Sequence, residues 1–249
     1  MAIKKSKRIY RLVSTQELAK ICVVIPAYNE GAVIHDVVAS LLNQAKKSRL
    51  ELDVVVVNDG SKDDTSNKAA EAGAIVINHI LNSGAGGATS TGLAYAASNP
   101  YLFAVTMDAD GQHLPEDVIK GIELMQSGNT DLLIGSRLID AKGMSKTKQL
   151  GNKGLSMITY MLFGIKSTDS QSGLRLFSRK ALDRLRWKTT GYEFCSEMLW
   201  RAHQLKLVVN EYPIQAVYTE YSKAKGQNNW NAINIIKSLL KRRLIEILG

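Results

Sequence analysis

The sequence predicts an α/β protein with a mostly parallel central sheet that is flanked by helices. Along the first half of the chain, short β-branched runs typical of buried strands alternate with stretches whose apolar residues recur every three or four positions. Such alternation is typical of a parallel sheet covered by helices on both faces. The 249 residues, 45% of them apolar, are enough for one large domain with a sizeable core.

The expected elements follow in order. Strands are predicted over residues 21–26, 52–57, 74–77, 102–105 and 131–134, and helices over 33–46, from about 65, over 88–97 and over 115–126. After residue 137 the pattern changes to a basic segment, an apolar stretch over 155–165, a strand at 174–177 and a strand pair over 207–217, broken at Pro213. We expect no membrane-spanning helix, because no apolar run is long enough, and no signal peptide, because no apolar core follows the basic N-terminus.

Positive charge is concentrated at the two ends of the chain. The formal net charge is +9, and residues 1–20 and 222–249 each carry six Lys or Arg residues and one Glu. Between Asn231 and Leu248 the apolar residues recur mostly at helical spacing, which predicts a basic amphipathic helix that lies on a membrane. Packing of this helix on the domain or on a second subunit, in a homo-oligomer, is the alternative. A nucleic-acid partner is not favoured, because no base-reading motif is present and aromatic residues are only 6%.

The cysteine content indicates the compartment. Cys22 and Cys195 lie in apolar surroundings far apart in sequence, as expected for buried thiols in a reducing environment. Together with the predicted membrane-binding helix, these thiols indicate a cytoplasmic protein that is peripheral at the inner face of the membrane. Its predicted parts are a basic segment over 1–20, a globular domain over 21–225 and the amphipathic helix over 226–249.

The most informative stretch follows the fourth predicted strand. Asp108 and Asp110 are separated by one residue, so a continued strand would point both from the same face. Two hard oxygen ligands followed by Gly111 suit Mg²⁺ or Mn²⁺ shared with a diphosphate. His113 lies near such a site or at the start of the next helix. The alternative is a polar turn in which Asp110 helps to cap the helix at Pro115.

Two more predicted strands end in acidic loops. Glu30 follows the first and Asp59 follows the second. Ligands of open α/β sheets bind outside the carboxyl ends of the strands. Four carboxylates on that rim would require a cation or a donor-rich ligand, and a divalent metal with a nucleotide supplies both. This convergence favours a functional site over a simple cap.

Two other phosphate-binding classes are disfavoured. Residues 84–89 begin with G-x-G, but Thr89 occupies the third fingerprint position and the run follows the third strand, which argues against a dinucleotide-binding oxidoreductase. No G-x-x-x-x-G-K-[ST] run exists, which excludes a P-loop enzyme.

Four motifs then occur in a characteristic order. They are Val24–Glu30 (VIPAYNE), Val57–Ser61 (VNDGS), Asp108–His113 (DADGQH) and Gly135–Arg137 (GSR). Together they resemble the family 2 glycosyltransferases of GT-A fold over about residues 21–180, with weaker likeness to about 225. Within that family, Asp169–Arg175 (DSQSGLR) resembles a segment of the dolichyl- or polyprenyl-phosphate sugar synthases. Two features depart from the pattern: Leu174 replaces the usual Phe, and the transmembrane helices of many relatives are missing.

The resemblance implies a GT-A nucleotide-diphospho-sugar transferase fold for residues 21–225 and a role for each matching residue. Asp108 and Asp110 would hold Mg²⁺ or Mn²⁺ and, with Arg137, carry catalysis. Arg137, Arg175 and Lys223 would lie near the phosphate of the acceptor. The nucleotide-sugar would contact Pro26, Ala27, Tyr28, Glu30, Asp59, Asp108, Ala109, Asp110 and Gln112.

The implied activity is an inverting, metal-dependent transfer of a hexose from a nucleotide-sugar to a polyprenyl phosphate, in the synthesis of cell-envelope polysaccharides. One alternative is extension of a lipid-linked or polymeric saccharide at a sugar hydroxyl, which needs a general base such as Glu193 or Glu197. Both glutamates are equally compatible with a role on a solvated helix face. A second alternative is an inert scaffold that binds a nucleotide-sugar, and the intact aspartate pair argues against it.

Overall fold

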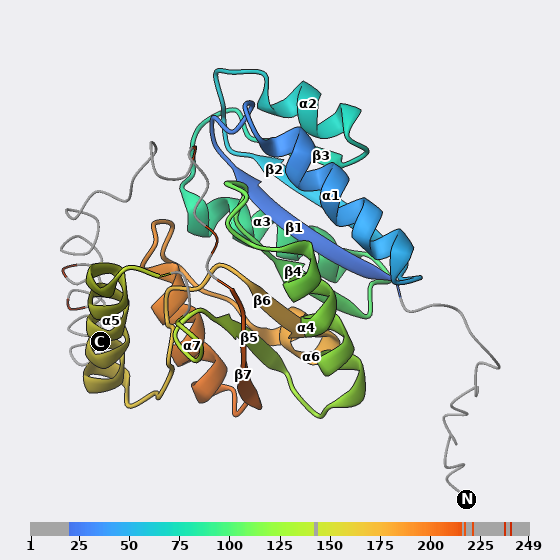
Figure 1. Cartoon of the computed structure of the whole chain (residues 1–249). Helices are drawn as coiled ribbons and strands as arrows, with labels where there is room; N and C mark the ends of the chain where they lie inside the picture. The colour runs from blue at the N-terminus through green and yellow to red at the C-terminus, as the bar shows by residue number, and fades with distance from the viewer. Residues whose placement is uncertain are drawn as a thin grey trace, which may run out of the picture.

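The computed structural model describes residues 20–141 and 144–215 and four single residues beyond them, Val217, Tyr221, Lys237 and Leu240 (Figure 1). The basic N-terminal segment and the C-terminal amphipathic helix, both predicted from the sequence, therefore lie almost entirely outside the described residues. In the part that is described, no helix is long and apolar enough to span a bilayer.

A seven-stranded sheet forms the centre of the molecule, in the order β3-β2-β1-β4-β6-β5-β7. Its strands are β1 (Ile21–Ala27), β2 (Leu52–Asn58), β3 (Ile75–Asn78), β4 (Phe103–Thr106), β5 (Leu132–Ser136), β6 (Arg175–Ser178) and β7 (Val209–Pro213). The pairings are parallel except that β6 runs antiparallel to both β4 and β5. The predicted α/β fold with a mostly parallel sheet is confirmed.

Helices cover both faces of this sheet, as Figure 1 shows. One face carries α1 (Ile34–Lys47), α2 (Thr65–Glu71) and α4 (Pro115–Ser127), and the other carries α3 (Ala85–Ser98), α5 (Lys146–Phe163), α6 (Arg179–Arg184) and α7 (Phe194–Gln204). Because side chains alternate along a strand, Cys22 and Val24 of β1 enter one core and Val23 and Ile25 the other. The strands are therefore apolar on both faces, which explains their unbroken β-branched runs.

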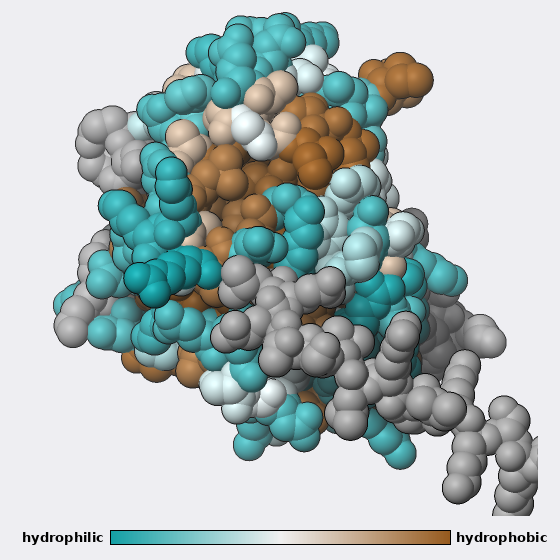
Figure 2. All heavy atoms as spheres, turned by 90° about the vertical axis from the view of Figure 1, so that its right-hand side faces the viewer, coloured by the Kyte–Doolittle hydropathy of each residue, from teal (hydrophilic) through white to brown (hydrophobic). Residues whose placement is uncertain are grey.

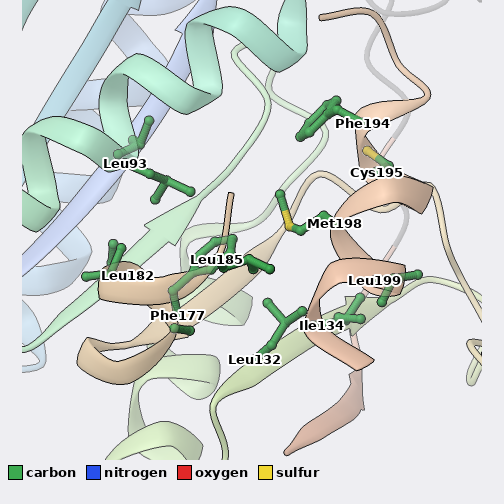
Figure 3. Close-up of a cluster of buried hydrophobic side chains, with 14 of the residues drawn as sticks. Leu93, Leu132, Ile134, Phe177, Leu182, Leu185, Phe194, Cys195, Met198 and Leu199 are labelled. Carbon is green, nitrogen blue, oxygen red and sulfur yellow. The ribbon is translucent and has the colours of Figure 1, made fainter. Parts of the chain in front are cut away.

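The first core lies between the sheet and α3, α5, α6 and α7. In Figure 3, Leu132 of β5, Phe177 of β6 and Met198 and Leu199 of α7 belong to one cluster of buried side chains. Cys195 is also buried here, and burial raises the pKa of its thiol to about 11. The thiol is therefore protonated at neutral pH, as expected of a structural cysteine.

The second core lies beneath α1, α2 and α4. Partly buried apolar residues border it, among them Leu42, Leu50, Leu52, Val76 and Phe103. Figure 2 shows the side of the molecule that is on the right in Figure 1, where an apolar area is surrounded by hydrophilic residues. The edges of the second core therefore reach the surface.

Most predicted elements are present with small shifts of their ends, but two differ. The prediction of a strand pair over 207–217 is wrong, because β7 is the only strand among the described residues of this range. It ends at Pro213, which lacks an N–H. Residues 155–163 of the apolar stretch form the second half of α5, where the sequence pattern predicts no defined element. Ser145 caps this helix by accepting a hydrogen bond from Lys148 N, and Gly164 ends it with φ of 71°.

The direction of β6 decides what lies at the functional edge of the sheet. Thr106, the last residue of β4, pairs with Arg175, the first residue of β6. Thr106 Oγ1 donates a hydrogen bond to Gly173 O (2.9 Å), and Gly135 N donates to Leu174 O (2.9 Å). The segment before β6 therefore lies beside the carboxyl ends of β4 and β5.

Candidate active site

Asp108 stands at this edge, against a glycine and a histidine. Its carboxylate lies 3.0 Å from Nε2 of His113, whose side chain is 2% exposed. A Cβ placed on Gly173 would lie only 2.3–2.5 Å from the carboxyl atoms of Asp108. The Asp108 carboxyl group therefore occupies the space that a side chain at position 173 would need.

Asp110 lies in the turn that follows. The backbone N of Gln112 donates to Asp110 Oδ1 (3.0 Å), and the side-chain amide of Gln112 donates to Oδ2. Strand β4 ends at Thr106, so strand alternation does not position the two aspartates. Both lie beyond the strand, before a turn at Gly111, which has φ of +75°. The capping alternative is also wrong, because Leu114 precedes α4 and no side chain caps it.

The two carboxylates differ in their electrostatics. Burial raises the pKa of Asp110, and the negative charge of Asp108 raises it further. Burial also disfavours the charged form of Asp108, but the hydrogen bond from His113 and the charges of His113 and Arg137 outweigh it and lower its pKa. The pair therefore carries repulsion that a bound cation would relieve.

The chemistry of this donor set fits Mg²⁺ or Mn²⁺. Mg²⁺ is commonly held by one or two carboxylates together with substrate phosphates and water. Among the residues that the structure describes, no group of three or more His, Cys, Asp or Glu side chains is arranged to hold a metal. Asp108 and Asp110 would therefore supply the protein's oxygen ligands, and a diphosphate and water the others.

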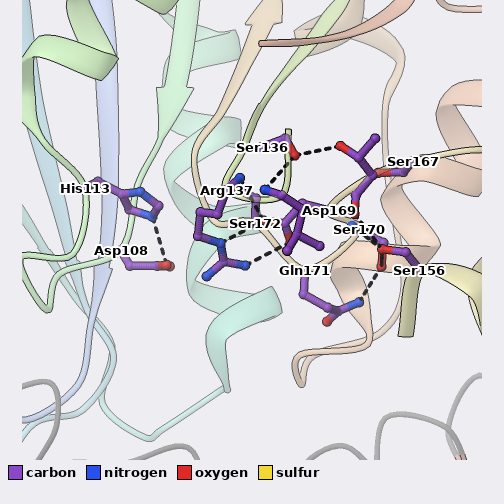
Figure 4. A network of polar contacts seen from close by, with 12 residues as sticks. Asp108, His113, Ser136, Arg137, Ser156, Ser167, Asp169, Ser170, Gln171 and Ser172 are labelled. Carbon is purple, nitrogen blue, oxygen red and sulfur yellow. Dashed lines mark hydrogen bonds and ion pairs between the residues drawn. The ribbon is translucent and has the colours of Figure 1, made fainter. Parts of the chain in front are cut away.

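Arg137 lies beside this pair and is fixed by Asp169. Its Nε and Nη2 atoms donate to the two carboxylate oxygens of Asp169 at 2.7 and 2.9 Å, and its backbone N also donates to Oδ2 at 3.2 Å. Asp169 is completely buried. Figure 4 shows this pair next to Asp108 and His113. Arg137 is thereby presented to the site in one orientation.

Arg175 does not play the acceptor role that was expected of it. Its side chain is 1% exposed and donates to the backbone carbonyls of Ser170, Ser172 and Cys195. It ties the segment before β6 to α7, and it cannot reach a ligand at the surface. The acceptor interpretation of Arg175 is wrong, and Lys223 lies outside the described residues.

The predicted nucleotide residues fall into two groups. Pro26 and Tyr28 are accessible at the end of β1, and Tyr28 is 42% exposed. Ala27 and Ala109 point into the second core instead, so their side chains do not line a pocket. Ala27 O accepts a hydrogen bond from Asp59 N (2.8 Å).

Glu30 and Asp59 have hydrogen-bond partners outside the aspartate pair. The Glu30 carboxylate accepts a hydrogen bond from the Tyr221 hydroxyl (2.8 Å). Asp59 is 3% exposed, and its Oδ1 accepts from Ser83 N, from Ser83 Oγ and from His79, while Oδ2 accepts from Gly84 N. Burial opposes the charge of Asp59, but these donors lower its pKa, so the carboxylate is ionised. Both residues nevertheless follow neighbouring parallel strands that share one edge of the sheet with β4, although among the described residues no three of the four carboxylates are arranged to hold one metal.

The glycine cluster before α3 has a packing role that the sequence does not reveal. Gly86 N donates to Thr190 O (2.7 Å), and a Cβ on Gly86 would lie 2.7 Å from Thr189 O. Glu197, 1% exposed, accepts from the backbone N–H groups of Lys188 (3.1 Å) and Thr189 (2.9 Å) and so holds the facing loop. Glu197 is thus a structural carboxylate and not an available base.

Comparisons with known proteins agree with this geometry. The model of the family described as Glycosyl transferase family 2 matches residues 22–186. The UDP-N-acetylglucosamine–dolichyl-phosphate N-acetylglucosaminyltransferase of Methanococcus voltae is 40% identical, with 92% of this chain and 98% of that protein covered. The undecaprenyl-phosphate mannosyltransferase of Micrococcus luteus is 30% identical, with 83% of this chain and 87% of that protein covered.

A solved structure shares the fold. Glucosyl-3-phosphoglycerate synthase from Mycobacterium tuberculosis, crystallised with Mn²⁺, uridine diphosphate and phosphoglyceric acid, superposes with a TM-score of 0.66. The identity is 22%, and the match covers 90% of this chain and 78% of that one. Fold and site together define a glycosyltransferase of the GT-A class. More narrowly, the chain belongs to glycosyl transferase family 2.

Replacing Gly173 by alanine is expected to reduce turnover on the order of 10²-fold, the loss typical of a reacting group displaced by about 1 Å. The added Cβ would collide with the Asp108 carboxyl group, and the Thr106–Gly173 hydrogen bond leaves the backbone little room to move. Steady-state kinetics and thermal unfolding measure the effect. Gly154→Ala in α5 is the matched control, because nothing lies within 4 Å of its added Cβ. Equal turnover of the two variants would contradict the described contact.

Proposed function

We propose that this chain transfers a sugar from a nucleotide-sugar to a polyprenyl phosphate, with a Mg²⁺ or Mn²⁺ ion held by Asp108 and Asp110 and with inversion of the anomeric carbon. The observation that carries this proposal is the aspartate pair next to an oriented arginine at the carboxyl edge of the sheet. The names of the Methanococcus and Micrococcus relatives, which include dolichyl phosphate and undecaprenyl phosphate, support the class of acceptor.

The residues of this chain divide the work between donor and acceptor. On the donor side, the loops after β1 and β2 would hold the nucleoside, and Asp108 and Asp110 would lie at its diphosphate. The metal, when bound, neutralises charge on the leaving nucleoside diphosphate. On the acceptor side, the Arg137 guanidinium would orient a phosphate, since guanidinium groups match phosphate geometry well.

A phosphate acceptor also agrees with the buried position of Glu197 on α7. A phosphate oxygen is already anionic at neutral pH and attacks without a general base, whereas a sugar hydroxyl needs one. Glu197 already accepts two backbone hydrogen bonds and is buried. Attack by the phosphate oxygen on the face opposite to the leaving diphosphate forms the new C–O bond as the old one breaks, which gives inversion. A lipid acceptor places this reaction at a membrane surface, and we propose the cytoplasmic one.

The test uses the full chain with UDP-, GDP- and dTDP-sugars, a polyprenyl phosphate, and Mg²⁺ or Mn²⁺. We expect one donor to give a lipid-linked sugar phosphate of inverted anomeric configuration, measured by NMR, and EDTA to abolish its formation. Transfer only to a saccharide hydroxyl would favour the alternative acceptor. Binding of a nucleotide-sugar without any transfer would favour a scaffold.

Asp59→Ala is expected to weaken nucleoside diphosphate binding by about 1.5–3 kcal/mol, the usual loss for hydrogen bonds to a charged group. Oδ2 of Asp59 accepts one described hydrogen bond, from Gly84 N, and so retains capacity for a nucleobase N–H. Isothermal calorimetry measures the affinity. Ser83→Ala is the control, because it removes one donor to Oδ1 and keeps the carboxylate. Unchanged affinity of Asp59→Ala would place this residue outside the nucleotide pocket.

A further inference from the structure

Helix α5 exposes apolar residues on the side that faces away from the core. Leu150, Met157 and Met161 are 74%, 64% and 68% exposed. They recur at steps of seven and four residues, so they lie along one stripe of the helix. The opposite side of α5 is already occupied, since Leu155 and Phe163 pack into the first core. A row of three large exposed side chains on one helix is unusual for a surface that meets only water.

The charged residues of the segment that contains this stripe are of one sign. Residues 144–166 contain four lysines and no Asp or Glu. These lysines, at positions 146, 148, 153 and 166, are all exposed. Apolar side chains combined with lysines and without acidic residues are typical of helices that lie in the interface of an anionic bilayer.

A pocket lies between this stripe and the sequence neighbours of the Arg137–Asp169 pair. It measures about 510 Å³, and its lining includes Lys153, Met157 and Tyr160 of α5. Its other walls include Leu138 and Thr168, the immediate neighbours of Arg137 and Asp169, and Glu211, whose carboxylate accepts hydrogen bonds from Ser167 and Thr168. Thr168 Oγ1 lies 2.6 Å from Ser136 Oγ, which fixes this wall to the end of β5. The pocket thus reaches from the exposed face of α5 to the residues beside the Arg137–Asp169 pair.

We propose that the exposed face of α5 docks on an anionic lipid bilayer, with Leu150, Met157 and Met161 among the acyl chains and Lys153 and Lys166 at the lipid phosphates. This inference rests on the proposed lipid-phosphate acceptor, which would enter the pocket from the bilayer. It assigns the membrane contact to a described helix, in addition to the C-terminal segment for which the sequence predicts the same role. An acidic protein or a second copy of the chain on this face are the outcomes to be distinguished.

The experiment measures flotation of the full-length protein with neutral phosphatidylcholine vesicles and with vesicles that contain phosphatidylglycerol. We expect binding to the anionic vesicles that falls as salt is added, because exposed charges are screened. Leu150→Glu combined with Met161→Glu is expected to lower the partition coefficient at least tenfold. Leu124→Glu, on α4 over the other core and 41% exposed, is the matched control.

A second variant tests the charges separately. Lys153→Glu combined with Lys166→Glu is expected to abolish the preference for anionic vesicles, and Lys47→Glu at the exposed end of α1 is its control. Thermal unfolding establishes that each variant folds. If the Leu150/Met161 and Lys153/Lys166 double variants both float with anionic vesicles to the same extent as the wild type, the proposal is overturned. A change from dimer to monomer in the Leu150/Met161 variant, with unchanged flotation, would overturn it in favour of a subunit interface.

Failure of this proposal is separable from failure of the proposed function. Transfer by the wild-type enzyme to a short, water-soluble prenyl phosphate needs no bilayer. Turnover in that assay, together with absence of vesicle binding, would retain the function and reject the α5 surface. Vesicle binding without turnover on any prenyl phosphate would reject the proposed acceptor and retain the surface.

Discussion

Asp110→Asn is expected to lower turnover by several orders of magnitude while the fold remains intact. Asparagine keeps the shape of the side chain but loses the charge that a divalent cation needs, and each 1.36 kcal/mol of lost transition-state stabilisation lowers the rate about tenfold. Burial and Asp108 disfavour the ionised form of Asp110 in the metal-free protein. Removal of that charge relieves repulsion, so the free energy of unfolding should not decrease.

The measurements are turnover with Mg²⁺ and Mn²⁺, calorimetric binding of Mn²⁺ in the presence of a nucleoside diphosphate, and thermal unfolding. Asp36→Asn is the matched control, because the Asp36 side chain is 91% exposed on α1. We expect the control to retain wild-type turnover and metal binding. Turnover of Asp110→Asn close to that of the wild type would remove Asp110 from the metal site.

Asp169→Ala is expected to lower the free energy of unfolding by about 3–5 kcal/mol, the range for breaking a buried ion pair. The variant leaves the guanidinium of Arg137, only 18% exposed at its side chain, without the carboxylate that holds it at 2.7 Å. Such a loss is a large part of the total stability of a typical domain, which is roughly 5–15 kcal/mol. Turnover should also fall, because Arg137 loses its fixed orientation beside Asp108.

Urea unfolding of the wild type and of two variants tests this expectation. Asp183→Ala is the control, because it breaks the Arg179–Asp183 pair, which has a similar distance of 3.0 Å but side chains that are 40% and 51% exposed. Exposed pairs of this kind contribute roughly 0–1 kcal/mol. An equal decrease in the free energy of unfolding of both variants would contradict a larger stabilising contribution from the buried Arg137–Asp169 pair.

The part of the site that could be predicted from the sequence is the part whose signals are local. Asp59, Asp108 and Arg137 each follow a strand that its own apolar run identifies, and in a parallel sheet those ends share one edge. The direction of β6 has no such local signal. The structural role of Arg175 has no local signal either, since its carbonyl partners include Cys195 on α7, twenty residues away.

The pairing of Arg137 with Asp169 shows a second limit of sequence patterns. The two residues are 32 positions apart and are joined through α5, whose length and direction decide whether they meet. Asp169 belongs to the DSQSGLR segment, which is the sequence signal for its importance. The burial of Asp169 and its bidentate contact with Arg137 can be seen only in the structure. Likewise, Gly84 and Gly86 pack against the backbone of residues 189–190, and no residue near the glycines in the sequence indicates this contact.

The antiparallel strand β6 also sets an order of events while the chain is being made. β5 reaches β4 only through β6, which follows it by about forty residues. Until residue 178 has left the ribosome, β4 and β5 each present an unpaired edge, and such edges promote aggregation. The contact between Thr106 and Gly173 spans 67 positions, so it closes late compared with the local β-α-β units before it. In a nascent chain that stalls before β6, the β-α-β units over β1 to β4 could fold while Arg137 still lacks its fixed position beside Asp108. The part of the site around Arg137 would therefore be assembled last.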